Sequence, residues 1–132
     1  MPNNGAILAP VAIGELIDKI TILEIKAERI ADPGKLRNVG NELAGLRAIR
    51  NQAGLDRPDM EPHARELKVL NTALWEIEDE IRELEAKKDF GPRFITLARS
   101  VYQTNDKRAA VKSRINQAFG SAIVEEKSYK GA

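Results

Sequence analysis

Apolar residues recur along the chain at the three- and four-residue spacing of an amphipathic helix. The first such stripe lies within residues 13–31 and consists of Ile13, Leu16, Ile20, Leu23, Ala27 and Ile30. Side chains three or four residues apart share one face of a helix, whereas a half-buried strand needs strict alternation. This segment is therefore predicted to be a helix with one buried face.

A second helix is predicted directly after the first. Asp32 supplies a side chain that caps a helix start, and Pro33 suits the first helical position, because the N–H that proline lacks would have no partner there. The helix is expected to end near Ala53. Gly40 and Gly45 fall inside it, and we expect close packing against another helix to be the reason for a missing side chain at these positions.

Two long helices are predicted in the second half of the chain. Residues 62–88 carry a stripe at heptad spacing, formed by Leu67, Leu70, Leu74, Ile77, Ile81 and Leu84. The last helix is predicted from Pro92 to Phe119. Residues 103–106 are mediocre helix formers, and a new helix starting after them is the alternative. The cations at 107 and 108 would oppose the dipole of a helix that starts there, so one continuous helix is favoured.

These segments predict an all-α fold, an elongated antiparallel bundle of about four helices, two of them long, in a single domain over residues 1–132. Residues 1–12 and 121–132 are predicted to be N-terminal and C-terminal arms. Ile22 and Ile25 form a second apolar strip on the first helix. That helix is therefore either central in the monomer or part of a dimer interface. Since elongated bundles commonly pair, we expect a homodimer.

Composition narrows the chemistry that this chain can perform. The 132 residues include no Cys and one His, which argues against thiolate chemistry, Cys-rich zinc sites, Ser-His catalysis and di-metal bundles built on Glu-x-x-His. No apolar run approaches the ~18 residues of a membrane span, and no basic region precedes the short apolar stretch at residues 7–13. We expect a cytoplasmic protein without a cofactor.

Charge is distributed unevenly along the chain. Residues 1–86 contain 11 Lys and Arg against 16 Asp and Glu, whereas residues 87–132 contain 10 against 4. In one interpretation, acidic and basic helices pair with each other within one molecule or across a dimer. In the other, the basic third of the chain faces an anionic partner. Nucleic acid is the weaker choice of partner, because the pI is only about 8.0 and few aromatic residues lie among the basic ones.

Polar residues also fall on helix faces that should be buried. In the first helix Glu24 shares the face of Ile20; a polar flank lies beside the heptad stripe of the third helix, and the apolar seam of the fourth becomes cationic midway. Burying an unpaired charge costs several kcal/mol. These residues therefore either form an internal salt-bridge network or line a ligand site. No catalytic or metal-binding residue is assigned, and the candidate ligand-binding residues are Glu24, Trp75, Glu78, Tyr102, Asn105, Arg108 and Lys112.

Four segments resemble a known protein family. They are residues 13–26 (IGELIDKITILEIK), 74–79 (LWEIED), 98–109 (ARSVYQTNDKRA) and 125–129 (EEKSY). Together they are similar to a family of short, about 130-residue, mostly bacterial helical proteins of unknown function, and the resemblance extends over residues 11–129. The signature is specific because it includes polar as well as apolar residues. The resemblance implies a helical fold and no particular activity.

Two hypotheses for the function follow. The first is a non-enzymatic module that self-associates and binds a protein partner through its long helices. The second is binding of an anionic ligand, such as a nucleotide or sugar nucleotide, or metal-dependent nucleotide handling, at an interhelical site built from Glu24, Glu78, Asp79, Arg108 and Lys112. An open pocket containing these side chains favours the second hypothesis. A closed and fully paired network without a cavity argues against it.

Overall fold

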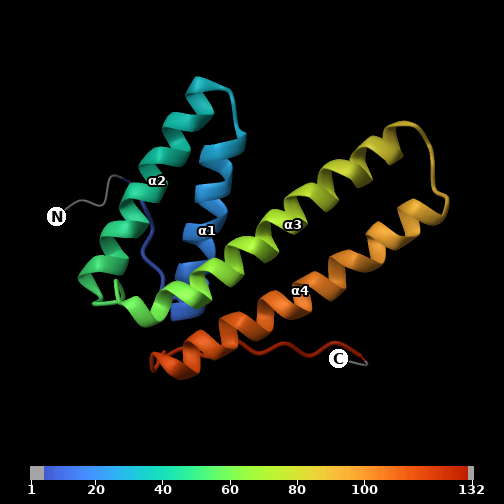
Figure 1. Cartoon of the computed structure of the whole chain (residues 1–132). Helices are drawn as coiled ribbons and strands as arrows, with labels where there is room; N and C mark the ends of the chain where they lie inside the picture. Colours follow the sequence, from blue (N-terminus) through green and yellow to red (C-terminus); the bar gives the residue numbers. More distant parts are fainter. Residues whose placement is uncertain (1–4, 131–132) are drawn as a thin grey trace.

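The computed structural model describes residues 5–130, which form helices joined by short loops (Figure 1). The helices are α1 (Ile13–Arg29), α2 (Pro33–Gln52), α3 (Glu61–Ala86) and α4 (Pro92–Ala118), and a short 3-10 helix, η1 (Pro58–Met60), precedes α3. No strand occurs within this range. The all-α prediction is confirmed, and each predicted helix end lies within two residues of the observed one. The prediction that α4 is continuous through residues 103–106 is also confirmed.

The four helices form two antiparallel hairpins of unequal length. The shorter hairpin, α1 and α2, lies against one end of the longer hairpin, α3 and α4, whose other end projects beyond it (Figure 1). Helix α1 contacts each of the other three helices. It is therefore the central helix of the fold, and side chains on several of its faces pack against other helices.

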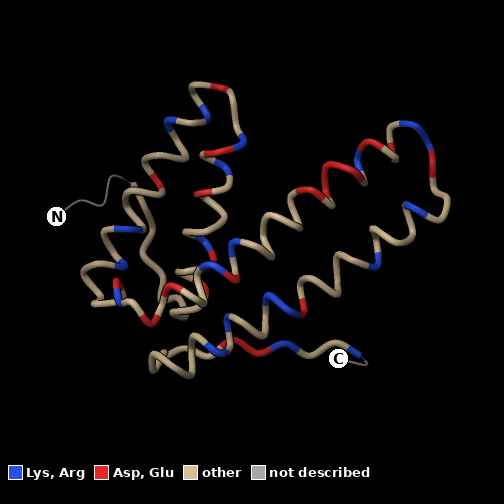
Figure 2. The backbone as a smooth tube through the Cα atoms, viewed as in Figure 1, with Lys and Arg blue, Asp and Glu red and all other residues tan. Residues whose placement is uncertain are grey.

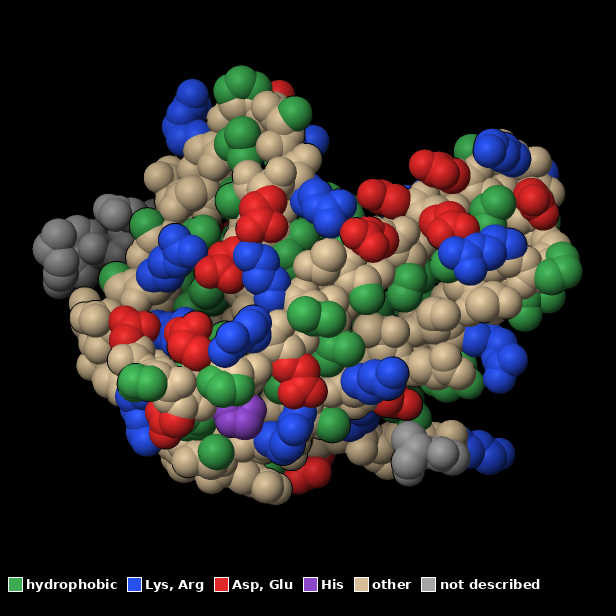
Figure 3. Space-filling view, viewed as in Figure 1, with side chains coloured by type: hydrophobic (Ala, Val, Ile, Leu, Met, Phe, Trp, Pro, Cys, Tyr) green, Lys and Arg blue, Asp and Glu red, His purple; other side chains and the backbone are tan. Residues whose placement is uncertain are grey.

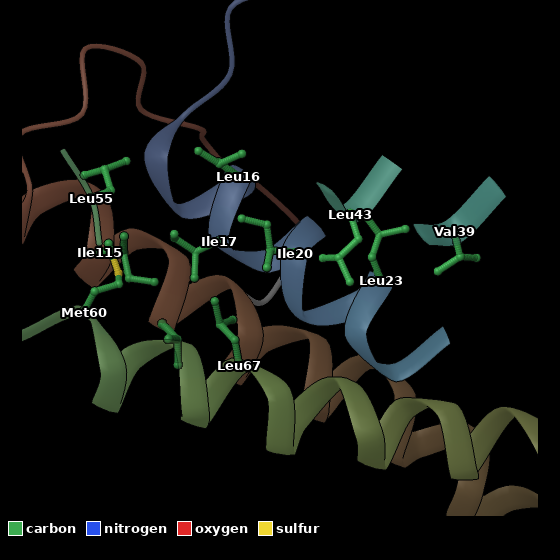
Figure 4. Close-up of a cluster of buried hydrophobic side chains, with 11 residues drawn as sticks. Leu16, Ile17, Ile20, Leu23, Val39, Leu43, Leu55, Met60, Leu67 and Ile115 are labelled. Atoms are coloured by element: carbon green, nitrogen blue, oxygen red, sulfur yellow. The ribbon is translucent and has the colours of Figure 1, made fainter. Parts of the chain in front are cut away.

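The apolar core lies where the two hairpins meet (Figure 4). Its buried members are Leu16, Ile17, Ile20, Leu23, Val39, Leu43, Leu55, Met60, Leu67, Val111 and Ile115. The projecting part of the long hairpin is different. Between Trp75 and Val101, Leu97 is the only buried residue. The heptad stripe of α3 is thus fully buried only near the core, and farther out it forms a half-buried seam with α4.

The second apolar strip of α1 is covered within the chain. Ile25 is buried and Ile22 is half buried, and both lie beside Leu74 and Trp75 of α3. Of the two alternatives raised by the sequence, a central position of α1 in the monomer is thus confirmed. The strip no longer argues for a dimer, which stays a prediction on other grounds.

The start of α1 is held by side chains from the other end of the chain. Ala12, at the N-cap position, makes no capping side-chain hydrogen bond. Instead the Ile13 N–H donates to Ser121 Oγ (3.0 Å), and the Gly14 N–H donates to Asn116 Oδ1 (2.7 Å). These bonds supply partners for two of the N–H groups that every helix start leaves without an intrahelical acceptor.

Gly14 allows α1 and α4 to approach closely. A Cβ atom at this position would lie 2.5 Å from the main-chain oxygen of Lys112, well inside van der Waals contact. Gly40 and Gly45 are different, because a Cβ atom at either would have no neighbouring atom within 4 Å. The expectation that these two glycines pack closely is therefore wrong: both lie on the exposed side of α2.

The chain beyond α4 turns back along that helix. Gly120, with φ 68°, takes the left-handed conformation that permits the turn. Residues 121–130 then run beside α4 without forming a helix (Figure 1). We call them the C-terminal segment.

The contrast between the glycines predicts opposite effects of alanine on stability. Gly14→Ala should lower the free energy of unfolding by about 1–3 kcal/mol, because the added methyl group forces α1 and α4 apart. Gly45→Ala should raise it by about 0.5–1 kcal/mol, because alanine is the better helix former and meets no obstacle. Urea denaturation followed by circular dichroism measures both. An unchanged midpoint for Gly14→Ala would contradict the close helix contact.

Candidate functional site

A buried ion pair joins α1 to α4. Asp18 of α1 has no exposed area (0%), and Arg108 of α4 donates to it through two nitrogens. The distances are 2.9 Å from Nε to Oδ1 and 2.5 Å from Nη2 to Oδ2. This parallel, two-bond geometry is the strongest arrangement of an arginine and a carboxylate. The hydrogen bond to Asp18 raises the pKa of Arg108 above its ordinary value, so the guanidinium is charged throughout the physiological range.

Helix α3 adds an amide to the same carboxylate. The side-chain N–H of Asn71 donates to Asp18 Oδ1 (2.9 Å) and to Thr21 Oγ1 (3.0 Å), and the Thr21 hydroxyl donates to the main-chain oxygen of Asp18 (2.7 Å). Among the described residues, no buried side-chain nitrogen or oxygen lacks a hydrogen-bond partner. Three helices therefore meet at one carboxylate whose hydrogen bonds are satisfied.

A second cation lies one turn farther along α4. Lys112 Nζ donates to Glu15 Oε2 (2.7 Å), and it lies 3.4 Å from Oε1 of Glu125 in the C-terminal segment. Burial by itself lowers the pKa of Lys112. The hydrogen bond to Glu15 and the nearby negative charges outweigh this effect, so the pKa is raised above its ordinary value. Lys112 is therefore protonated at neutral pH.

These contacts form a regular polar seam between the two helices. Because α1 and α4 are antiparallel, residue numbers rise along α1 while the numbers of their partners fall along α4. From the start of α1 inward, the three contacts are Gly14 with Asn116, Glu15 with Lys112, and Asp18 with Arg108. The seam fixes the register of α1 on α4.

The cations of this seam open onto a cleft between α4 and the C-terminal segment. The cleft has a volume of about 590 Å³. It is lined by four cations, one carboxylate and two tyrosines, together with small and apolar side chains: Val101, Tyr102, Asn105, Asp106, Arg108, Ala109, Lys112, Lys127, Tyr129 and Lys130. Asp18 and Glu15 do not line it, so the carboxylates that pair with Arg108 and Lys112 lie on the protein side of these cations. We call this space the basic cleft.

A second cleft, of about 380 Å³, lies between α1 and α3 and shares Arg108 with the basic cleft. Its lining combines four apolar side chains with four charged ones and an amide. It is formed by Ile22, Ile25, Asn71, Leu74, Trp75, Glu78, Asp79, Arg82 and Arg108. We call it the apolar cleft. The charged residues continue along the far half of α3, where acidic residues are concentrated (Figure 2).

The structure places six of the seven predicted ligand-binding residues at these two clefts. Tyr102, Asn105, Arg108 and Lys112 line the basic cleft. Trp75 and Glu78 line the apolar cleft.

Glu24 is not brought to either cleft. Its carboxylate pairs with Arg47 of α2 (3.0 Å) and is half buried, at the junction between the two helices of the short hairpin. The reason is geometric: Glu24 lies on the flank of α1 that faces Arg47 of α2, whereas Arg108 approaches a different flank, at Asp18.

Sequence reasoning missed Asp18, the residue that holds Arg108. A signal was present, because Asp18 precedes Ile22 by four residues and Ile25 by seven and so continues the second apolar strip of α1. An acid on a strip that needs cover requires a buried cation or amide. The two lysines and the tyrosine that the C-terminal segment adds to the basic cleft were also missed, and no periodic signal marks them.

The comparisons with known proteins identify a family. A model described as a family of unknown function (DUF6165) matches residues 9–132, and the chain belongs to this family. The resemblance found in the sequence is thereby confirmed. No curated protein and no solved structure is significantly similar to the chain.

Neither a cluster of metal ligands nor a membrane-spanning helix occurs within residues 5–130. No group of three or more His, Asp or Glu side chains is placed to hold a metal ion. No helix in this range combines the length and apolar composition that crossing a membrane requires.

The Asp18–Arg108 pair predicts a large and specific stability effect. Arg108→Leu should cost about 3–5 kcal/mol of unfolding free energy, because it leaves a carboxylate buried without a counter-charge. The matched control is Arg93→Leu. Arg93 makes the same two-bond contact with Glu80, with its Nη2 at 2.7 Å from Oε1, but the pair is exposed, so its loss should change the unfolding free energy far less than the loss of Arg108.

The double variant Asp18→Leu with Arg108→Leu separates two contributions to the stability loss: the loss of the ion pair, and the burial of an unpaired Asp18 carboxylate. It should recover most of the stability that Arg108→Leu loses, since no buried charge is left. Chemical denaturation measures all three variants. Equal losses for Arg108→Leu and Arg93→Leu would show that the buried pair does not hold the helices together.

Proposed function

We propose that this chain, a member of the family of unknown function DUF6165, binds a small anionic ligand such as a nucleotide or sugar nucleotide in the basic cleft. One observation carries the proposal. Arg108 and Lys112 line the cleft, whereas the carboxylates of Asp18 and Glu15, with which they pair, do not. A ligand in the cleft therefore meets the positive side of both pairs.

Donor groups are still free on these two side chains. A guanidinium has five N–H donors. Asp18 accepts two of those of Arg108 and Asn105 accepts one, at 3.3 Å from Nη1, so two N–H groups have no acceptor among residues 5–130. Lys112 has three donors and two carboxylate neighbours. Preorganised donors of this kind bind anions well, because their positions are set before the ligand arrives.

The rest of the cleft suits a ligand that has a ring as well as a charge. The side chains of Tyr102 and Tyr129 line the cleft and are exposed, so their rings are free to stack on a base or pack against a sugar. The volume of about 590 Å³ falls in the range typical of small-molecule sites. These features favour a nucleotide-like compound over a simple inorganic anion.

Isothermal titration calorimetry with ADP and with pyrophosphate tests this proposal. We expect the wild-type protein to bind ADP more tightly than pyrophosphate. Lys112→Met should weaken binding of both by about tenfold or more, which is the loss of a hydrogen bond to a charged group. Lys107→Met is the matched control, because Lys107 is exposed on the same helix and does not line the cleft.

The outcome that would overturn the proposal is the absence of binding by the wild-type protein, or equal losses in the two lysine variants. Arg108 is not used as the probe, because its removal also breaks the buried pair with Asp18.

A second candidate function, self-association, is supported by a separate observation at the apolar cleft. Leu74 and Trp75 of α3 line this cleft and are only half buried, and the far half of the long hairpin beyond them has a seam that is also half buried. The space-filling view shows a notch between the short hairpin and the far half of α3 (Figure 3). Two helices alone seldom bury enough apolar surface, so a further helix packed here would stabilise the hairpin.

A second copy of this chain is the proposed partner. Asp79 on α3 and Arg99 on α4 form no ion pair with any residue among 5–130. A partner related by a two-fold axis would bring the acidic far half of α3 toward the basic α4 of its neighbour, which pairs charges that one chain leaves apart.

Light scattering after gel filtration tests this second candidate. The wild-type protein should have twice the 14.6 kDa mass of the chain. Leu74→Glu should yield monomers, because it places a charge in the apolar cleft. The control is Val69→Glu, the same kind of change at an exposed position of α3 that lines neither cleft, and it should leave the dimer intact. A monomeric wild-type protein contradicts self-association.

A further inference from the structure

We infer that the C-terminal segment competes with the ligand for Lys112 at the edge of the basic cleft, because the carboxylate of Glu125, which lines a neighbouring pocket, pairs with the ammonium that a phosphate group of the ligand would bind. The inference rests on the proposed ligand site and adds to it both a ligand chemistry and an internal competitor. It follows from the contacts that hold the segment and from the geometry of the two cations on α4.

Glu125 is the only residue of the C-terminal segment within the described part of the chain that pairs with a cation of α4. Its Oε1 lies 3.4 Å from Lys112 Nζ, and its side chain is 47% exposed. The ammonium of Lys112 makes a shorter contact, of 2.7 Å, with Glu15 on the protein side. Lys112 is therefore held by a short contact to Glu15 of α1 and by a longer one to Glu125. Lys112 and Glu125 both line a pocket next to the basic cleft.

The segment is attached to the rest of the protein by few contacts. Its first residue, Ser121, accepts a hydrogen bond from the N–H of Ile13 and anchors it beside the start of α1. Beyond this anchor every residue from 122 to 130 is exposed. Two ion pairs, Glu125 with Lys112 and Lys127 with Asp106, connect these residues to α4. The carboxylate of each pair is exposed to water, which weakens the contribution of such pairs to stability, so the segment can leave the cleft at low cost while Ser121 stays in place.

A phosphate group has the properties needed to displace Glu125. A carboxylate has one negative charge and two oxygens, and Glu125 makes no hydrogen bond to Arg108. Lys112 and Arg108 are one helical turn apart, about 5–6 Å between their Cβ atoms. A phosphate at this place has up to two charges and three terminal oxygens, which reach Lys112 and the free N–H groups of Arg108 together. It therefore makes more bonds than the side chain that it replaces.

The same segment also contributes to the cleft after Glu125 has moved. Lys127 and Tyr129 line the basic cleft, and the ammonium of Lys127 lies 5.2 Å from the centre of the Tyr129 ring. The segment thus supplies a competing carboxylate at Glu125, and an ammonium group and an aromatic ring at Lys127 and Tyr129. Removing the whole segment should consequently raise the affinity less than removing the Glu125 carboxylate alone does.

The test is the affinity of the full-length protein for pyrophosphate and for ADP, measured by calorimetry. Glu125→Gln should tighten binding of both about fivefold to tenfold, because it removes the competing charge and keeps the size of the side chain. Glu126→Gln is the matched control. It removes the same charge from the next residue, which forms no ion pair among the described residues, and should change affinity by no more than about twofold.

A structural readout accompanies the affinities. In ¹⁵N NMR spectra of the wild-type protein, saturating pyrophosphate should shift the amide signals of residues 123–126 toward random-coil positions, while that of Ser121 stays where it is. A truncation after residue 124 should bind ADP more weakly than Glu125→Gln does, because it also removes Lys127 and Tyr129.

The results separate this inference from the proposed function. If neither the wild-type protein nor Glu125→Gln binds pyrophosphate or ADP, the ligand site itself is wrong. If the wild-type protein binds and Glu125→Gln binds no more tightly, the ligand site stands and the competition is overturned. Equal gains for Glu125→Gln and Glu126→Gln also overturn it, because they indicate a general effect of charge.

Discussion

The carboxylate of Asp18 is the constraint on which the arrangement of the helices depends. A charge without access to water is tolerated only where counter-charges and hydrogen-bond donors surround it. Here α4 supplies Arg108 and α3 supplies Asn71, so that α1 is tied to both helices of the long hairpin at one point. Apolar packing alone would allow α1 to slide or rotate on that hairpin, because leucine and isoleucine contacts are similar in neighbouring registers. The polar contacts select one of them.

Satisfying Asp18 also determines where the protein offers functional groups. The guanidinium of Arg108 faces Asp18 with one edge, and it lines the basic cleft on one side and the apolar cleft on the other. Lys112 repeats the arrangement one turn away, with the half-buried Glu15 of α1 on one side and the basic cleft on the other. The sequence presented a paired network and an open cleft as alternatives. In the structure Arg108 and Lys112 belong to both, because each pairs with a carboxylate of α1 and also lines the basic cleft. Because Arg108 belongs to both clefts, a ligand in one and a partner chain in the other would act on a shared side chain.

Local periodicity was enough to predict the helices, because each depends on its own apolar stripe and on cap residues such as Asp32 and Pro33. The same reasoning predicted that Tyr102, Asn105, Arg108 and Lys112 share a face, since they lie on one continuous helix. It did not predict which helix would cover which face. Glu24 was expected beside Arg108 because a helical wheel shows which way a side chain points from its helix axis but not which helix packs on that side. The helix on that side is α2, whose Arg47 pairs with Glu24.

The glycines show the same limit of sequence-based prediction. Gly14 and Gly45 look alike in the sequence, and only the passage of α4 beside Gly14 makes its missing side chain essential.

The most direct test of this account is an NMR measurement on the arginine Nε–H groups. Arg108 Nε–H, assigned by comparison with Arg108→Lys, should exchange with water much more slowly than the Nε–H of the exposed Arg93, because it is bonded to a carboxylate with no exposed area. Its signal should also shift when pyrophosphate is added. Exchange as fast as that of Arg93, together with no response to pyrophosphate, would contradict both the buried pair and the cleft that it supports.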